Sequence, residues 1–167
     1  MITGLDDLSE SIAYFTTRAA EKLRRDGSVA ANILVFIHTN PFKDDAPQYK
    51  GSIIVPLNQP SDDTMELIGA AIKGLKEIYR SGFHYKKSGV LLMGLQSKGS
   101  VQATLFDDTD KQEKSVKMMR TLDAINKRMG KGSVTMAASG IKHRWAMRRE
   151  RQSPNYTTNW LELPVVE

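Results

Sequence analysis

Apolar residues recur at three- and four-residue steps in two stretches of the first eighty residues. The first stretch, from Leu8 to Leu23, follows Asp6 and Asp7 and carries basic residues near its far end. Such periodicity and charge placement predict an amphipathic helix that ends near Asp26-Gly27. The second stretch follows Ser61-Asp62-Asp63, which supplies an N-cap, and predicts a helix to about Arg80.

Three runs rich in β-branched and aromatic residues predict strands over Val29–His38, Lys50–Leu57 and Lys86–Leu95. The second run is expected to end at its proline, with a turn over Asn58–Ser61. The resulting order is helix, strand, strand, helix, strand. It predicts an α+β fold in which two helices cover one face of an antiparallel sheet, as in a split βαβ unit.

The split βαβ pattern needs a strand before the first helix, and residues 1–4 are too short to supply a good one. The predicted sheet therefore lacks its first strand. Because an incomplete sheet exposes unpaired backbone groups, we expect the chain to form a homodimer or to rearrange at that edge.

The last third of the chain predicts a small helical and irregular unit over residues 115–167. Its apolar positions are typical of an amphipathic helix over Ser115–Arg128, and Val134–Ala138 is expected to form a short strand. Residues 98–114, between this unit and the first 97 residues, form the predicted linker.

Charge separates the two parts of the chain. Residues 1–110 hold 12 Lys and Arg against 14 Asp and Glu, whereas residues 111–167 hold 12 against 5. The excess positive charge of the last third favours nucleic acid or an acidic protein as partner, and a merely solvated tail is about as probable from charge alone.

Composition excludes several kinds of chemistry. The chain has no cysteine, which excludes disulfides, thiolate nucleophiles and cysteine-bound zinc. The histidines, His38, His84 and His143, have no second histidine at a useful local spacing, so no metal site is expected. No apolar run approaches the length of a membrane span and no signal peptide is apparent, which predicts a cytoplasmic protein.

No catalytic residues are expected. The paired carboxylates, such as Asp62-Asp63 and Asp107-Asp108, all fall at helix starts or in loops, where they usually cap or solvate the backbone. The sequence also lacks a serine triad, a phosphate-binding glycine loop and a zinc-protease motif.

The predicted sheet offers a candidate nucleic-acid interface. Alternation places Lys50, Ser52 and Ile54 on the face opposite Ile53 and Val55, and sends one of two successive lysines outward on the third strand. Lysines, small polar groups and backbone N–H groups can contact phosphates without sequence preference. An ordinary solvated face is the alternative. The candidate DNA-binding residues are His38, Thr39, Lys50, Ser52, Lys86, Lys87 and Ser88.

Two further sets of residues predict protein binding. Leu105 and Phe106 form an apolar pair in a polar connector, with Gln102 three residues before the leucine, which is typical of a short peptide ligand for another protein's pocket. Near the C-terminus, aromatic residues are interleaved with arginines, which suits single-stranded nucleic acid or a partner groove. A tryptophan that anchors the tail onto the small C-terminal unit is an equally good alternative. The candidate partner-binding residues are Arg144, Trp145, Arg148, Arg149, Tyr156 and Trp160.

Several segments resemble the C-terminal part of UmuC-type proteins, the catalytic subunits of DNA polymerase V in the Y-family of translesion polymerases. The segments are AAEKLRR (Ala19–Arg25), TNPF (Thr39–Phe42), YKKSGVLLMGL (Tyr85–Leu95), LDAINKRMGKGS (Leu122–Ser133) and RWAMRRERQSPNYTTNWLELPVV (Arg144–Val166). Together they cover nearly the whole chain.

The resemblance implies a little finger DNA-binding domain over residues 1–97, a linker with a clamp-binding motif over residues 98–114, and a UmuC-type C-terminal region over residues 115–167. Gln102, Leu105 and Phe106 would enter the sliding clamp, primer-template DNA would meet the sheet, and UmuD′ and RecA would meet the last third. The chain would act in DNA repair and the SOS response. It would hold no cofactor, since the palm residues that bind magnesium in such polymerases lie outside it. A stand-alone protein that binds clamp or DNA without a polymerase is the alternative.

Overall fold

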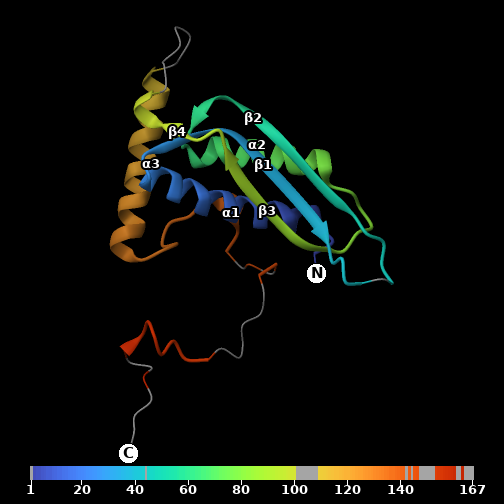
Figure 1. The fold of residues 1–167 in the computed structure, drawn as a ribbon. Coiled ribbons are helices and arrows are strands. Elements are labelled where there is room, and N and C mark those ends of the chain that lie inside the picture. The colour runs from blue at the N-terminus through green and yellow to red at the C-terminus, as the bar shows by residue number, and fades with distance from the viewer. Residues whose placement is uncertain are drawn as a thin grey trace, which may run out of the picture.

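An antiparallel sheet in the order β2-β1-β3 lies against helices that cover one of its faces (Figure 1). The computed structural model describes residues 2–43, 45–100, 109–141, 143, 145–146, 153–160 and 163. The predicted α+β class is confirmed. The elements of this layer are α1 (Leu5–Arg25), β1 (Ser28–Thr39), β2 (Lys50–Ser61), α2 (Thr64–Ile78), β3 (Tyr85–Met93) and β4 (Gln96–Ser97), a short strand that pairs with the start of β1.

The second strand is longer than predicted. β2 continues past Pro56 to Ser61, so the predicted turn over residues 58–61 is wrong. β2 lies at the edge of the sheet, where the missing N–H of a proline need not break a ladder. Its pairing with β1 shifts register between Ala30 and Asn32, which accommodates the extra residues. α2 begins as predicted, because Asp63 accepts hydrogen bonds from the N–H groups of Met65 and Glu66.

The core forms between the covered face of the sheet and the two helices. Ile33, Val35 and Ile37 of β1 are fully buried, as the period of a strand requires. They pack with apolar residues from α1 and α2 and with Tyr85. The Tyr85 hydroxyl donates to the carbonyl of Arg80 at 2.8 Å, so its one polar group is satisfied in the core.

In place of the strand that a split βαβ unit has before its first helix, the structure has a single β-bridge. Ile2 pairs with Tyr85 through two backbone hydrogen bonds of 3.1 and 2.8 Å. In the part of the chain that the structure describes, no other residue pairs with the outer edge of β3. The expectation that residues 1–4 cannot form a full strand is confirmed.

A glycine allows α2 to approach the sheet closely. A Cβ at Gly74 would lie 2.7 Å from Cγ2 of Val55, whereas a Cβ at Gly69 in the same helix would meet nothing within 4 Å. We expect Gly74→Ala to lower the free energy of unfolding by about 1 to 3 kcal/mol through overpacking. Gly69→Ala, the matched control, is expected to raise it by about 0.5 to 1 kcal/mol, because alanine restricts the unfolded chain. Urea unfolding measures both, and equal effects would contradict the predicted close packing.

The helix α3 (Thr109–Met129) begins earlier than the predicted Ser115. Met119 is buried against the rest of the protein, and the hydroxyl of Ser115 hydrogen-bonds a carboxylate oxygen of Asp63, the N-cap of α2. No described helix is both long and apolar enough to cross a membrane.

The strand predicted over Val134–Ala138 does not form. The side chain of Asn126 donates to the carbonyl of Val134 at 2.8 Å and accepts from its N–H at 2.9 Å. Both backbone groups of Val134 are thereby paired with a side chain instead of a neighbouring strand. A short 3-10 helix, η2 (Ala137–Ser139), follows and packs on α1, where Ser139 hydrogen-bonds Thr17 at 3.2 Å.

Candidate nucleic-acid interface

The face of the sheet opposite the helices is assembled from three strands by their register. His38 pairs with both Lys50 and Lys87, Phe36 with Ser52 and Gly89, and Leu34 with Ile54 and Leu91. Paired residues of antiparallel strands point to the same side, so these nine residues share one surface. We call this surface, formed by Leu34, Phe36, His38, Lys50, Ser52, Ile54, Lys87, Gly89 and Leu91, the open face.

One end of the open face is cationic. His38 lies between Lys50 and Lys87 in the register. Burial and then the two neighbouring lysines lower the pKa of His38 below its ordinary value of 6.5, so the imidazole is neutral at pH 7. The positive charge of this end therefore comes from the lysines. The ring of His38 lies against that of Phe36, with centroids 5.2 Å apart.

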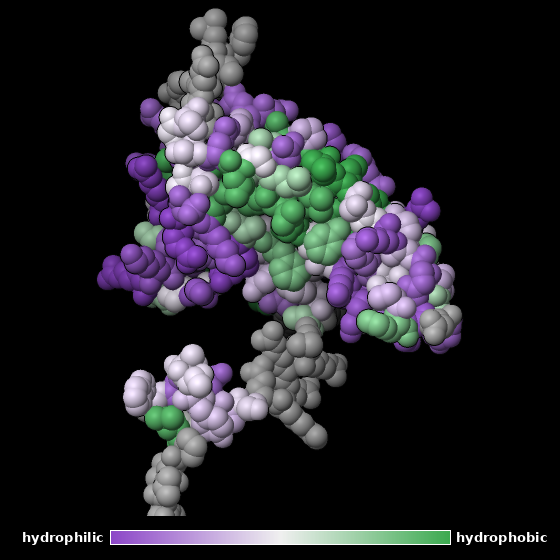
Figure 2. Space-filling view, in the orientation of Figure 1, coloured by the Kyte–Doolittle hydropathy of each residue, from purple (hydrophilic) through white to green (hydrophobic). Residues whose placement is uncertain are grey.

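The middle of the open face is apolar. Ile54 is 50% exposed and Leu91 is 56% exposed, and hydrophobic side chains gather over the strands in Figure 2. A Cβ at Gly89 would lie 2.6 Å from Cζ of Phe36, so the Phe36 ring occupies the space directly over this glycine of β3. The predicted face of scattered cations and small polar groups is thus correct only at one end. The sequence showed these apolar residues, and only the register brought them together.

Two of the candidate DNA-binding residues lie off the open face, and a third has no position in its register. Thr39 is buried and its hydroxyl donates to Oε1 of Gln48 at 2.6 Å. Ser88 hydrogen-bonds Ser11 of α1 at 2.7 Å, which places it on the covered side. Lys86 has no partner in the β1–β3 register, which shifts between His38 and Thr39, and its side chain is exposed. His38, Lys50, Ser52 and Lys87 remain as candidates on this face.

Trp145, the first of the two tryptophans, is held against α1. Trp145 Nε1 donates to Oε1 of Glu10 at 3.2 Å, and its ring lies 5.2 Å from that of Tyr14 and 5.4 Å from that of Phe15, centroid to centroid. Trp145 is therefore an anchor, but it is held on α1 and not on the small C-terminal unit that the sequence-based alternative named.

Of the other candidate partner-binding residues, the structure describes two. Tyr156 and Trp160 are exposed. Arg144, Arg148 and Arg149 lie outside the described residues, and so do Gln102, Leu105 and Phe106 of the predicted peptide ligand.

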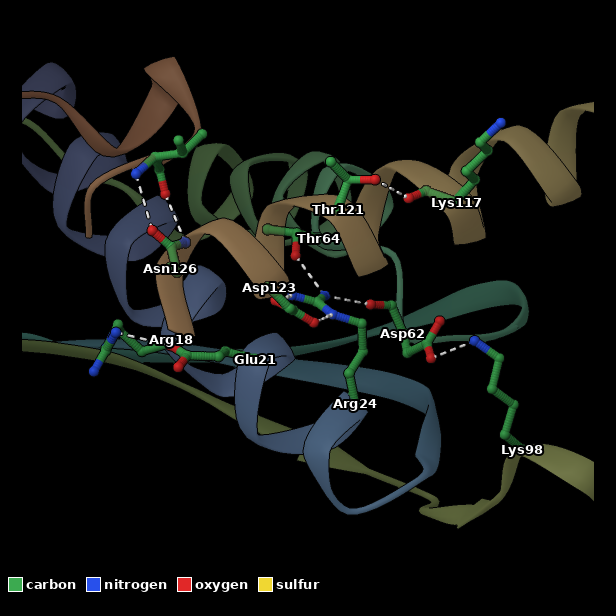
Figure 3. A network of polar contacts seen from close by, with 11 residues as sticks. Arg18, Glu21, Arg24, Asp62, Thr64, Lys98, Lys117, Thr121, Asp123 and Asn126 are labelled. Carbon is green, nitrogen blue, oxygen red and sulfur yellow. Dashed lines mark hydrogen bonds and ion pairs between the residues drawn. The ribbon is translucent and has the colours of Figure 1, made fainter. Parts of the chain in front are cut away.

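One polar network was not predicted. The guanidinium of Arg24, at the end of α1, donates to both carboxylate oxygens of Asp123 on α3 at 2.7 and 2.8 Å, and also to the carbonyl of Asp62 and the hydroxyl of Thr64 (Figure 3). Lys98 forms an ion pair with Asp62 at 2.6 Å. In the sequence, Arg24 looked only like a basic residue suited to a helix C-terminus. The network joins α1 and α3 to the start of α2.

In the part of the chain that the structure describes, no three His, Cys, Asp or Glu side chains are grouped so that they could hold a metal ion. A sheet face with lysines at one end and an apolar middle is suited to binding an extended partner.

Comparison with known proteins defines the class of this chain. Residues 1–105 match the C-terminal domain of the impB/mucB/samB family, and residues 116–166 match a domain of unknown function (DUF4113). The chain belongs to the impB/mucB/samB family.

Individual relatives agree over almost the whole chain. It is 38% identical to Protein UmuC of Salmonella typhimurium over 162 residues, 35% identical to Protein ImpB of Salmonella typhimurium over 164 residues, and 37% identical to Protein MucB of Escherichia coli over 164 residues. Between 97 and 98% of this chain is covered in these matches. The chain spans 38% of the length of each of these relatives.

Proposed function

We propose that this chain is the DNA-holding and clamp-binding C-terminal part of an error-prone Y-family translesion polymerase that acts in DNA repair and the SOS response. The observation that carries the proposal is the family membership of residues 1–105, together with likeness to UmuC and MucB over nearly the whole chain. The chain itself performs no catalysis. The parent polymerase uses magnesium bound by residues of its palm, outside this chain.

The open face supports binding of primer-template DNA. Lys50 and Lys87 provide cations for phosphates at one end, and neutral His38 between them adds a polar group without charge. The apolar middle, formed around Phe36 and Leu91, suits the sugars and thymine methyl groups of a duplex. Contacts of this kind position DNA without selecting a sequence, as a polymerase that moves along its template requires.

Salt dependence tests this assignment. We expect Lys50→Ala with Lys87→Ala to weaken binding to primer-template DNA and to reduce the slope of log K against log salt by about two, because each lost phosphate contact contributes about 0.9. Fluorescence anisotropy over a range of salt concentrations measures the slope. Lys73→Ala with Lys76→Ala, on the exposed side of α2, is the matched control and is expected to change it little. If the two double variants behave alike, the open face is not the DNA surface.

The proposed clamp-binding peptide, Gln102 to Phe106, spans the end of the first matched region. The first family match ends at residue 105 and the second begins at residue 116. Leu105 is the last residue of the first match, and Phe106 directly follows it. Gln102, Leu105 and Phe106 would enter an apolar pocket of the sliding clamp, by the same three-position pattern that the sequence shows.

The C-terminal region is the proposed contact for UmuD′ and RecA. It carries the excess positive charge of the chain, and its described part presents Tyr156 and Trp160 to solvent while Trp145 anchors it on α1. Exposed aromatic residues are typical anchors of a protein interface.

A further inference from the structure

An aromatic side chain stands almost fully exposed in the connection between β1 and β2. Phe42 is 90% exposed. Its N–H donates to Oδ1 of Asn40 at 3.3 Å, and the N–H of Lys43 donates to the carbonyl of Asn40 at 3.2 Å. The turn of Asn40, Pro41, Phe42 and Lys43 is therefore hydrogen-bonded within itself, with the phenyl ring directed into solvent.

Gln48 braces the same loop from its other side. Its amide nitrogen donates to the carbonyls of Lys43 at 2.7 Å and Ala46 at 3.2 Å, and its Oε1 accepts from the hydroxyl of Thr39 at 2.6 Å. One side chain thus connects the end of β1 with two points of the loop. Phe42 is thus exposed on a loop whose conformation is held by hydrogen bonds. A large apolar side chain exposed on such a loop is suited to binding a partner molecule.

The charges around the loop favour a nucleic acid as that partner. The loop leaves β1 directly after His38 and Thr39 and enters β2 at Lys50, so it extends the cationic end of the open face. Lys43 adds a further exposed cation beside Phe42, and the loop sequence continues with two carboxylates, those of Asp44 and Asp45. The cations that could meet phosphates here are therefore Lys43 together with Lys50 and Lys87 of the open face. An aromatic ring beside lysines matches the way proteins bind single strands, with a base stacked on the ring and phosphates on the cations.

We propose that Phe42 is a stacking platform for an unpaired base, next to the duplex that the open face holds. The inference rests on the proposed DNA-binding function and adds a contact to it. The ligand is the single-stranded segment of a primer-template junction, and any base suits it because every base presents a π-face. A pocket of another protein could also bind a phenyl ring. The lysines at this end of the sheet favour DNA as the partner, because they can contact its phosphates.

The test compares two DNA substrates with the full chain. Anisotropy measures binding to a blunt duplex and to the same duplex with a single-stranded overhang. We expect Phe42→Ala to weaken binding of the overhang substrate by about tenfold and to leave the blunt duplex unchanged. Phe42→Trp is expected to retain the tighter binding, because it keeps an aromatic face. Ile141→Ala removes a comparably exposed apolar side chain, 94% exposed, from the C-terminal segment and serves as the control.

A spectroscopic readout reports stacking itself. With 2-aminopurine in the overhang, we expect the chain to quench the probe, and Phe42→Ala to remove that quenching. If the unmodified chain binds neither substrate, both the DNA-binding function and the stacking role fail. A second outcome is that the unmodified chain binds both substrates while Phe42→Ala either binds the overhang substrate with the same affinity or loses affinity for both substrates equally. Either result overturns the stacking role and leaves the DNA-binding function standing.

Discussion

Replacing both Leu105 and Phe106 with alanine is expected to weaken binding of the sliding clamp by about 100-fold or more. Each apolar side chain that a pocket buries contributes roughly 1.5 to 3 kcal/mol, and a few such anchors dominate small interfaces. A short peptide has little else with which to bind. Calorimetric titration of the full chain with the clamp measures the loss.

The control for this prediction is Leu95→Ala. Leu95 is exposed, apolar and close in sequence, yet outside the three-position pattern. We expect it to leave clamp affinity unchanged, and the double variant to keep the circular dichroism spectrum and the DNA affinity of the unmodified chain. Clamp affinity that survives in the double variant would remove Leu105 and Phe106 from the interface.

Arg24→Leu is expected to lower the free energy of unfolding by about 2 to 4 kcal/mol. The side chain of Arg24 is only 8% exposed and makes four hydrogen bonds, two of them to Asp123. Leucine fills part of the space but leaves the Asp123 carboxylate, the Asp62 carbonyl and the Thr64 hydroxyl without their partner. Urea unfolding followed by circular dichroism measures the change.

Arg18→Leu provides the matched control, since it removes the same kind of side chain from the same helix. Arg18 pairs with Glu21 at 2.8 Å, but both side chains are about one third exposed. Such a pair contributes at most about 0.5 kcal/mol. Equal destabilisation by the two variants would contradict the role of the Arg24 network. We further expect faster proteolysis next to α3 in Arg24→Leu only, because the ion pair with Asp123 holds that helix against α1.

Local pattern was sufficient for most of the secondary structure. The spacing of Leu8, Ile12 and Leu23 predicted α1, and all three side chains are buried. Asp63 was predicted within the cap of α2 and accepts the expected backbone hydrogen bonds. Such signals depend on neighbours along the chain, which a sequence displays directly.

Errors arose where a distant partner decided the local structure. Pro56 was expected to end a strand, but the edge position of β2 tolerates it. Val134 was expected in a strand, but Asn126 takes both of its backbone groups. In each case the competing interaction comes from an element that the local pattern does not reveal.

The sequence by itself determined α1, α2, the existence of β1, β2 and β3, the α+β class and the position of the Leu105–Phe106 pair, because these follow from periodicity and composition. Only the tertiary structure decided which side chains share the open face. The register of three strands placed two lysines around His38 and an apolar patch around Phe36, and it turned Ser88 toward α1. A slip of one residue would reverse every side chain of a strand, so the register, and not composition, fixes what a sheet presents to a partner.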